Sequence, residues 1–425
     1  MLQHQRSMLF LGDIVSLILG FAVMILLRFD IHHQQAFIGQ QAVLFGWLFA
    51  LWLIIFFIFE LYNLRRVNPN PRNIGLLLFS MLTNIALGIV FFYFFSRNGI
   101  TPKTNLVLVA FFSLVFLALW RRLFYYLFTM RFKRSIATIG TNPHITELQA
   151  ELQKHPHFGA LTVHWDSVNE ASVDRMVDII ISEHTDPQTL LTLSKALNAE
   201  TLTLMEGYET FFAKIPLSLI TDEKAITIMT RHDNKAVQFF YRLIEILVAL
   251  FVLIITCPFV LIALIARLIE DGRPMFYTHK RVGKNGTLFN VYKLRSMKKD
   301  AERQGAVWAD HKDARITPLG QLLRKTHIDE VPQMINIIKG DIALVGPRPE
   351  RPEFVSELER HIPYYFLRHT IRPGFTGWAQ IKYRYARSID EAQEKFEYDM
   401  YYLKNRSLML DVGIVLKTLQ IIFTH

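Results

Sequence analysis

Long apolar runs with few charges dominate the first 130 positions of the chain. Four of these runs have the length of a membrane span, at residues 8–27, 43–61, 74–95 and 105–120. A helix rises 1.5 Å per residue, so about 20 residues cross a hydrocarbon core ~30 Å thick. Four such runs leave too little polar surface to cover them in a soluble fold. We therefore predict a four-helix transmembrane bundle over residues 1–130. Its first helix is expected to be retained, because the run is too long for a signal-peptide core.

Basic residues in the connections predict the orientation of this bundle. Residues 29–41 contain no Lys or Arg, and the connection between the third and fourth runs contains Arg97 and Lys103. The other connections are more basic: Arg65, Arg66 and Arg72 follow the second run, and Arg121, Arg122, Arg131, Lys133 and Arg134 follow the fourth. Cationic loops stay on the cytoplasmic side. Both ends of the bundle, and the chain that follows it, are thus expected on the cytoplasmic face of the membrane.

Between residues 131 and 230 short apolar strands alternate with helical segments. We predict strands at 135–140, 177–182 and 202–205, and helices at 144–155 and 187–198. This alternation is typical of a parallel sheet. A dinucleotide site would need several glycines after the first strand, and here Gly140 stands alone. We interpret the module as a degenerate Rossmann-like unit with a structural or regulatory role, and ligand binding by it is left open.

A further uncharged run covers residues 247–266, with Pro258 at its twelfth position. Proline removes a backbone donor and clashes with the preceding turn. Basic residues on both sides, such as Arg242 and Arg267, can reach the same head-group layer. We therefore predict a re-entrant helix with a break at Pro258, followed by a mainly helical cytoplasmic catalytic domain, together over residues 231–425. A kinked but complete span is the alternative.

The composition narrows the class of protein further. The 425 residues are 51% hydrophobic and 20% charged, with a net charge of +10, which excludes a single soluble globule and a disordered chain. The one cysteine, Cys257, excludes an intramolecular disulfide framework and a Cys-rich zinc module. Residues 273–387 contain 22 Lys and Arg against 11 Asp and Glu. Because no nucleic-acid module is recognisable, we expect a diphosphate substrate near a membrane and no nucleic-acid partner.

One acidic pair, Asp329-Glu330, stands out by its surroundings. A helical pattern that contains Arg324 leads into the pair, and an apolar helix follows it. Further on, two prolines flank Arg348 and fix the backbone that aims its guanidinium. Carboxylates framed by fixed cations suit a metal-dependent phosphoryl-transfer site.

Six motifs around this pair occur in a recognisable order. They are Arg281-Val-Gly-Lys-Asn-Gly286, Tyr292-Lys-Leu-Arg-Ser-Met297, Thr317-Pro-Leu-Gly320, Asp329-Glu-Val-Pro-Gln333, Gly346-Pro-Arg-Pro349 and Arg372-Pro-Gly-Phe-Thr-Gly-Trp378. In these motifs and their spacing, the chain from about residue 241 onward resembles the polyprenyl-phosphate phosphoglycosyl transferases, the monotopic superfamily of bacterial sugar transferases. The preceding segments resemble those of its large, three-part members. Cys257-Pro258 and Asp271-Gly-Arg-Pro274 depart from the usual pattern, and neither involves the acidic pair.

The resemblance implies an undecaprenyl-phosphate hexose-1-phosphate transferase. Such an enzyme takes the sugar phosphate from a UDP-hexose, releases UMP and starts the repeat unit of an exopolysaccharide, capsule or O-antigen. Asp329 would be the nucleophile of a covalent aspartyl-phosphosugar intermediate, and Glu330 would hold Mg²⁺. The expected substrate-binding residues are Arg348 for the nucleotide phosphates, Lys293, Arg295 and Arg281 for the lipid phosphate or diphosphate, and Arg372.

Two other interpretations remain at this stage. A non-enzymatic membrane scaffold or sensor with a degenerate transferase domain is the first, and the intact Asp329-Glu330 pair argues against it. A polytopic lipid-phosphate transferase is the second, and it would need many more spans than the four predicted here. The sequence does not identify the sugar, and homo-oligomerisation is left open.

Overall fold

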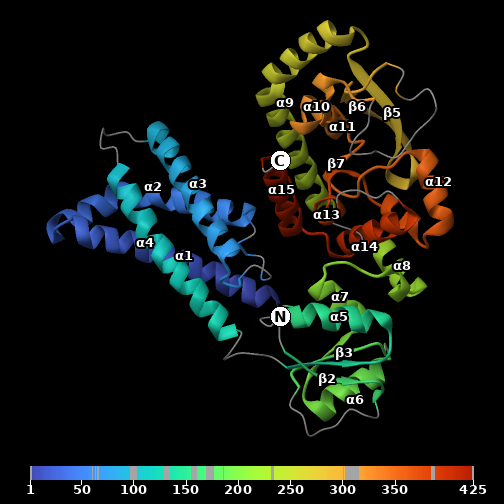
Figure 1. Ribbon diagram of the computed structural model, residues 1–425, viewed down its shortest axis with the longest axis horizontal. Helices are drawn as coiled ribbons and strands as arrows, with labels where there is room; N and C mark the ends of the chain where they lie inside the picture. Colours follow the sequence, from blue (N-terminus) through green and yellow to red (C-terminus); the bar gives the residue numbers. More distant parts are fainter. Residues whose placement is uncertain are drawn as a thin grey trace. The chain divides into compact units, whose positions relative to one another are not determined.

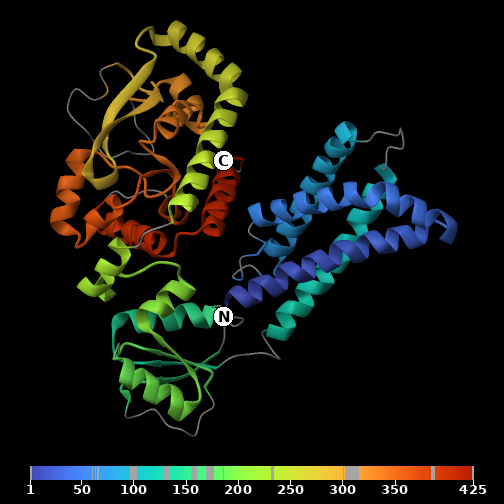
Figure 2. The same cartoon turned by 180° about the vertical axis from the view of Figure 1, so that it is seen from behind.

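The computed structural model describes residues 2–59, 61–62, 64, 67–95, 103–128, 135–154, 160–168, 177–184, 186–230, 234–299, 301, 315–383 and 388–423. The described chain is mostly helical and divides into two compact units, Met1–Phe211 and Phe212–His425. Figures 1 and 2 show both units from opposite sides. The predicted division into three parts, at residues 130 and 230, stays a prediction.

Four long apolar helices begin the first unit. They are α1 (Leu2–Arg28), α2 (Ile31–Ile58), α3 (Pro71–Phe95) and α4 (Lys103–Tyr126). The four predicted helices are thereby confirmed as helices, although α2 begins well before residue 43. The polar residues ahead of residue 43 include no proline, so nothing there ends a helix. By length and composition these four helices and α9 of the second unit can each cross a membrane.

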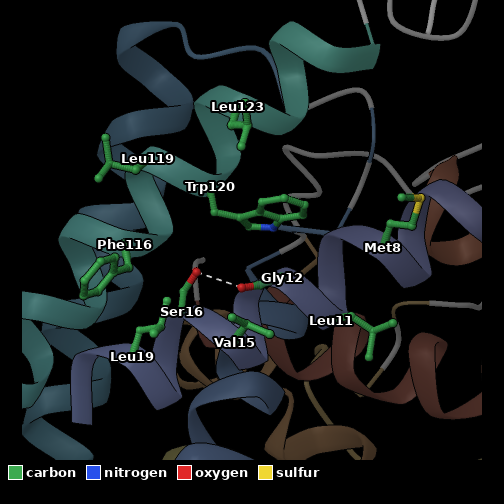
Figure 3. Close-up of a pocket in the computed structure, with 10 residues that line it drawn as sticks. All are labelled: Met8, Leu11, Gly12, Val15, Ser16, Leu19, Phe116, Leu119, Trp120 and Leu123. Atoms are coloured by element: carbon green, nitrogen blue, oxygen red, sulfur yellow. Dashed lines mark hydrogen bonds between the residues drawn. The ribbon is translucent and has the colours of Figure 1, made fainter. Parts of the chain in front are cut away.

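The helices α1 and α4 pack closely against each other (Figure 3). Gly12 allows this approach, because a Cβ atom there would lie 1.9 Å from the ring of Trp120. The indole nitrogen of Trp120 donates to the Leu9 carbonyl at 3.2 Å, and an apolar recess of about 480 Å³ lies beside it. Asp13, fully buried, accepts a hydrogen bond from Arg121 at 2.5 Å. Asp13 therefore makes a structural contact between α1 and α4.

The bundle's orientation and its arrangement as a four-helix bundle in a bilayer stay predictions. Several of the basic residues that predict the orientation lie outside the described residues, namely Arg65, Arg66, Arg97, Arg131, Lys133 and Arg134.

A four-stranded parallel sheet completes the first unit, with the strand order β2-β1-β3-β4. Its strands are β1 (Ser135–Ile139), β2 (Ala160–Trp165), β3 (Ile179–Ser182) and β4 (Glu200–Thr203), and its helices are α5 (Pro143–Lys154), α6 (Pro187–Leu197) and α7 (Leu204–Phe211). The predicted parallel sheet is confirmed, whereas β2 and α7 were not anticipated. After β1, the Glu183 carboxylate accepts from the amides of Thr141 and Asn142, both at 3.0 Å. In a dinucleotide site the amides after the first strand bind phosphate. Here the amides of Thr141 and Asn142 bind Glu183 instead.

The second unit begins with a short 3-10 turn, η5 (Leu217–Leu219), and α8 (Asp222–Met229), followed by α9 (Lys235–Asp271). Then come an antiparallel hairpin, β5 (Phe276–Val282) and β6 (Leu288–Leu294), with the turn η6 (Lys284–Gly286), and α10 (Pro318–Lys325), η7 (Ile328–Glu330) and α11 (Gln333–Lys339). The remaining elements are β7 (Ala343–Val345), α12 (Pro352–His361), η8 (Tyr365–His369), β8 (Gly374–Thr376), α13 (Trp378–Lys382), α14 (Ile389–Asn405) and α15 (Leu408–Phe423). Strands β7 and β8 pair in parallel. The helices predicted on either side of the acidic pair are confirmed as α10 and α11.

Helix α9 runs for 37 residues with Pro258 inside it. The predicted break of the helix at Pro258 is therefore wrong. Proline removes one amide donor and displaces one carbonyl, so a long helix can continue past it with a kink. Figures 1 and 2 show that the axis of α9 bends, and nearby Thr256 donates to the Val252 carbonyl at 2.6 Å, a contact that favours bending. The path of α9 through a bilayer, re-entrant or spanning, stays a prediction.

Charged side chains at both ends of α9 dock it onto the rest of this unit. Arg242 donates to the Ile337 carbonyl at 2.6 Å, in the last turn of α11. Arg267, only 1% exposed, donates to the Met297 carbonyl at 2.8 Å and to the Thr317 hydroxyl at 3.0 Å. The apolar middle of α9 packs on α11 through Ala249 and its neighbours. The segment that carries the acidic pair, between α10 and α11, is thus held against a long helix at two places.

Candidate active site

The acidic pair lies on a single tight turn between α10 and α11. His327 enters this turn in the left-handed region, with φ of 57°, and η7 then carries Asp329 and Glu330. The amide of Glu330 donates to the His327 carbonyl at 3.1 Å. The side chain of Asp329 is buried, with the residue 6% exposed. The short turn η7 lies between α10 and α11 and therefore restricts the positions of both carboxylates.

Two cations meet at one oxygen of Glu330. Lys293, on β6, donates from Nζ to Glu330 Oε1 at 2.6 Å, and Arg348 donates from its guanidinium to the same oxygen at 2.9 Å. The three residues come from the second, fourth and fifth of the motifs, which are up to 55 positions apart in the chain. The fold therefore places the cations against the acidic pair, as expected for a site that handles phosphate charge.

The two neighbouring carboxyl groups have pKa values displaced in opposite directions. Burial, reinforced by the charge of Glu330, raises the pKa of Asp329 to about 6, against the opposing effect of Lys293. Burial alone would also raise the pKa of Glu330, but Lys293 and Arg348 outweigh it and hold that pKa well below its ordinary value. Glu330 is thus ionised at neutral pH, whereas the pKa of Asp329 lies much closer to neutral pH. Titratable groups with divergent pKa values are typical of catalytic sites.

Asn336, on α11, fixes the strand that carries Lys293. This residue is fully buried, and its amide group donates to the Asn290 carbonyl at 2.7 Å and accepts from the Tyr292 amide at 3.1 Å. It also donates to the Asp341 carboxylate at 2.9 Å. One side chain therefore ties β6 to the turn after α11. The sequence analysis missed Asn336, although a polar residue on the buried face of an otherwise apolar helix is the signal that marks it.

Glycines bring the fifth and sixth motifs together. A Cβ atom on Gly346 would lie 2.8 Å from the Gly374 nitrogen, and one on Gly374 would lie 2.1 Å from the Gly346 nitrogen. The amide of Gly346 donates to the Thr376 carbonyl at 2.9 Å. The two backbones could not approach this closely with any larger residue at these positions. This contact sets the start of the segment that leads to Arg348.

The other predicted substrate-binding residues have partners away from the acidic pair. Arg281 donates to the Pro349 carbonyl at 2.9 Å. Arg295 donates to the Gly272 carbonyl at 2.8 Å. Arg372 donates to Glu245 of α9 at 2.9 Å. Of the five cations predicted to bind substrate, the structure therefore brings Lys293 and Arg348 to Glu330, and substrate contact by the other three stays a prediction.

The donor set suits a magnesium ion that is shared with a substrate. Mg²⁺ is usually bound in proteins by one or two carboxylates together with substrate phosphates, and Asp329 and Glu330 are such carboxylates. Among the described residues, no three His, Cys, Asp or Glu side chains gather into a metal cluster. The chain thus fits Mg²⁺ with Glu330 as a ligand, provided that phosphate oxygens supply the remaining positions. Magnesium binding itself stays a prediction.

A buried carboxyl group with a pKa of about 6 therefore lies next to an anion bound by Lys and Arg, a combination that is typical of catalytic sites. The family model of the bacterial sugar transferases matches residues 236–425, which include all of these residues. The chain belongs to this family.

Named relatives agree with this assignment. The chain is 43% identical over 186 residues to the UDP-N-acetylgalactosamine-undecaprenyl-phosphate N-acetylgalactosaminephosphotransferase of Aeromonas hydrophila, a match that covers 44% of each chain. It is 36% identical to the undecaprenyl-phosphate galactose phosphotransferase of Salmonella typhimurium, over 44% of this chain and 41% of that one. An uncharacterized sugar transferase of Bacillus subtilis is 37% identical over 42% of this chain and 85% of its own length. The matched segment spans less than half of the Aeromonas and Salmonella proteins.

Proposed function

We propose that this protein transfers a hexose-1-phosphate, or the N-acetylated equivalent, from a UDP-sugar to undecaprenyl phosphate. The products are UMP and an undecaprenyl-diphosphate-sugar, with which the assembly of a bacterial surface polysaccharide begins. The observation that carries the proposal is the convergence of Lys293 and Arg348 on Glu330 beside the buried Asp329. Relatives whose names state undecaprenyl-phosphate sugar phosphotransfer support it.

Asp329 is the proposed nucleophile. Its carboxylate oxygen forms a bond to the phosphorus that carries the sugar, while the bond from that phosphorus to the UMP oxygen breaks and UMP leaves with the electron pair. An oxygen of the lipid phosphate then attacks the same phosphorus. The bond to Asp329 breaks, and the free carboxylate is restored. Splitting one transfer into two steps in this way is the usual advantage of covalent catalysis.

Glu330, Lys293 and Arg348 prepare the site for the diphosphate. Glu330 would hold Mg²⁺, which when bound neutralises charge on the diphosphate. Lys293 and Arg348 lie within hydrogen-bond distance of Glu330 and can turn to phosphate oxygens that enter next to it. A fixed cation is worth more in a partly buried site than in water, because the surrounding dielectric is lower. The membrane location, with this site on the cytoplasmic face of the inner membrane, is part of the same proposal.

UMP release tests the proposal directly. The purified full chain in nanodiscs is incubated with Mg²⁺, undecaprenyl phosphate and, in turn, UDP-glucose, UDP-galactose and their N-acetyl forms. We expect sustained UMP release with at least one sugar, its loss in EDTA, and its loss in the Asp329→Asn variant. Absence of UMP release with every UDP-sugar, from a protein that is folded, would favour the non-enzymatic scaffold instead. The panel also identifies the sugar, which depends on a few hydroxyl contacts.

A further inference from the structure

The segment from Gly346 to Glu350 carries Arg348 but belongs to no helix or strand. Such a segment needs partners for its backbone groups, because buried carbonyls that lack hydrogen bonds are costly. Two prolines within it, Pro347 and Pro349, have no amide hydrogen and fix their own φ angles. The carbonyls are therefore the groups through which the rest of the fold can hold this segment in place.

Each of the carbonyls from Pro347 to Glu350 accepts a hydrogen bond from a different residue outside the segment. The amide of Gly374 donates to Pro347 at 2.9 Å, and the amide of Val282 donates to Glu350 at 3.0 Å. Between them, two arginine side chains take the place of backbone donors. Arg368 binds the Arg348 carbonyl at 2.8 Å, and Arg281 binds the Pro349 carbonyl at 2.9 Å.

Arg368 is itself rigidly held. The residue is 4% exposed, and its guanidinium also binds Asp399 at 3.0 Å and the hydroxyl of Tyr365. Asp399 and Tyr365 are 2% and 3% exposed. A buried charge that loses its partner strongly destabilises the fold. The cluster of Arg368, Asp399 and Tyr365 is therefore expected to keep this one arrangement. That arrangement fixes the carbonyl of Arg348 from the side of α14.

Arg281 is held from the opposite direction, on β5. Its Nε donates to Nε2 of His279 at 2.7 Å, two positions earlier on the same face of the strand. The ring of His279 stacks on Tyr277 with centroids 5.2 Å apart. Since the accepting nitrogen of His279 carries no proton, the imidazole is neutral and orients the guanidinium without repelling it. Arg281 thereby binds the carbonyl that follows Arg348 from a fixed position.

We propose that Arg281 and Arg368 are positioning residues that aim Arg348 at Glu330, and that their effect on the sugar-nucleotide substrate passes through the Arg348 guanidinium. This proposal rests on the proposed function and deepens it. The sequence motifs suggest direct phosphate contact by Arg281, and the structure assigns it to a backbone carbonyl instead. The carbonyls of Arg348 and Pro349, which directly follow the Arg348 side chain in the backbone, are thus each bound by a cation from a different element, while that side chain reaches the acidic pair.

A double-mutant cycle decides whether Arg281 acts through Arg348 or contacts the substrate directly. Arg281→Met and Arg348→Met are made singly and together in the full chain, and KM for the UDP-sugar and kcat are measured by UMP release. If Arg281 acts through Arg348, we expect Arg281→Met to raise KM about tenfold, as for the loss of one charge-assisted hydrogen bond. In the Arg348→Met background the same change should alter KM less than about twofold. Equal effects in both backgrounds would overturn the proposal, because Arg281 would then contact substrate independently.

Three further variants make the result specific. Lys280→Met removes the same charge from the exposed opposite face of β5 and should leave KM unchanged; a rise equal to that of Arg281→Met would mean that charge alone matters. Arg281→Lys keeps a cationic donor and should recover most of the loss. Arg368→Lys, put through the same cycle, provides a second route if Arg281→Met does not fold. Activity in the wild type tests the proposed function separately, so failure of the cycle leaves that function standing.

Discussion

Glu330 and Lys293 are joined by a hydrogen bond of 2.6 Å between Oε1 and Nζ, across 37 positions of the chain. This contact helps to lower the pKa of Glu330, whereas burial raises the pKa of Asp329, one residue earlier, to about 6. Two adjacent carboxyl groups therefore contribute to stability with opposite signs. The difference follows from the partners of each, because only Glu330 is bound by two cations.

The first prediction concerns the stability of Asp329→Asn and Glu330→Gln. The folded-state pKa of Asp329 is raised from an ordinary 3.8 to about 6. The stability that the protonated carboxyl group contributes is therefore present below pH 3.8 and is lost as pH rises through about 6. At pH 7.5 Asp329→Asn should therefore stabilise the fold, by on the order of 2 kcal/mol. Glu330 has a lowered pKa, and its contribution is present above its ordinary value of 4.5. Glu330→Gln should therefore destabilise the fold at the same pH.

Melting temperatures at pH 7.5 and pH 4, followed by intrinsic fluorescence, check this prediction. The gain in Asp329→Asn should disappear at pH 4, where the wild-type carboxyl is protonated. Two variants that shift Tm in the same direction at pH 7.5 would contradict the assigned charges.

The second prediction is the pH dependence of turnover. The nucleophile must be ionised, so kcat/KM should rise with pH and level off above a midpoint near 6. The charge of Arg324 lowers the pKa of Asp329, and removal of that charge in Arg324→Gln should move the midpoint to higher pH. Arg324→Lys keeps the charge and serves as the control, with a midpoint close to that of the wild type. A midpoint that is the same in all three proteins would mean that another group titrates.

The third prediction concerns Asn336. Replacement by Ala leaves the Tyr292 amide and the Asn290 carbonyl without their partner, which costs roughly 1–3 kcal/mol for each buried group. Because β6 carries Lys293, activity should fall along with stability in Asn336→Ala. Ile335→Ala, at the neighbouring exposed position of α11, is the matched control and should change the free energy of unfolding by less than about 0.5 kcal/mol. Loss of stability with full activity at low temperature would show that Lys293 needs no such support.

The fourth prediction places the start of the smallest stable catalytic fragment. Trp378 donates to the Ala213 carbonyl at 2.8 Å, and Glu397 accepts from the Leu217 amide at 3.1 Å. These contacts bind residues 213–217 to the unit that contains the acidic pair. A 212–425 fragment should therefore be monodisperse in detergent and release UMP, whereas a 231–425 fragment should melt at a lower temperature. Equal melting temperatures for the two fragments would contradict a structural role for this segment.

The sequence pattern predicted most of the helices and strands, because these elements depend on neighbouring residues. The apolar runs became helices, the helices predicted on either side of Asp329 were confirmed, and the alternation after residue 134 gave a parallel sheet. The strand Ala160–Trp165 was missed, although its apolar and polar residues alternate and Gly159 precedes it in the sequence. A break was expected at Pro258, yet α9 continues past it with a bend, because proline removes only one amide donor.

The partners of the cations could not be predicted from the sequence. Arg281, Arg348 and Arg368 look alike in the sequence as basic residues, and their roles differ through contacts with residues 18 to 68 positions away. The pair Arg368–Asp399 has no motif of its own. The close approach of Gly346 and Gly374, together with the pairing of β7 and β8, shows that the fifth and sixth motifs form one structure.

The central claim is that Asp329 carries the sugar phosphate between donor and acceptor. The most direct measurement is the intact mass of the protein after brief incubation with Mg²⁺ and the UDP-sugar that supports UMP release, without undecaprenyl phosphate. We predict a mass increase of one glycosyl-phosphate group, mapped to the peptide that contains Asp329, and its discharge when undecaprenyl phosphate is added. Asp329→Asn should show no increase. Turnover in the absence of any adduct on the wild type, or an adduct that persists in Asp329→Asn, would contradict the account.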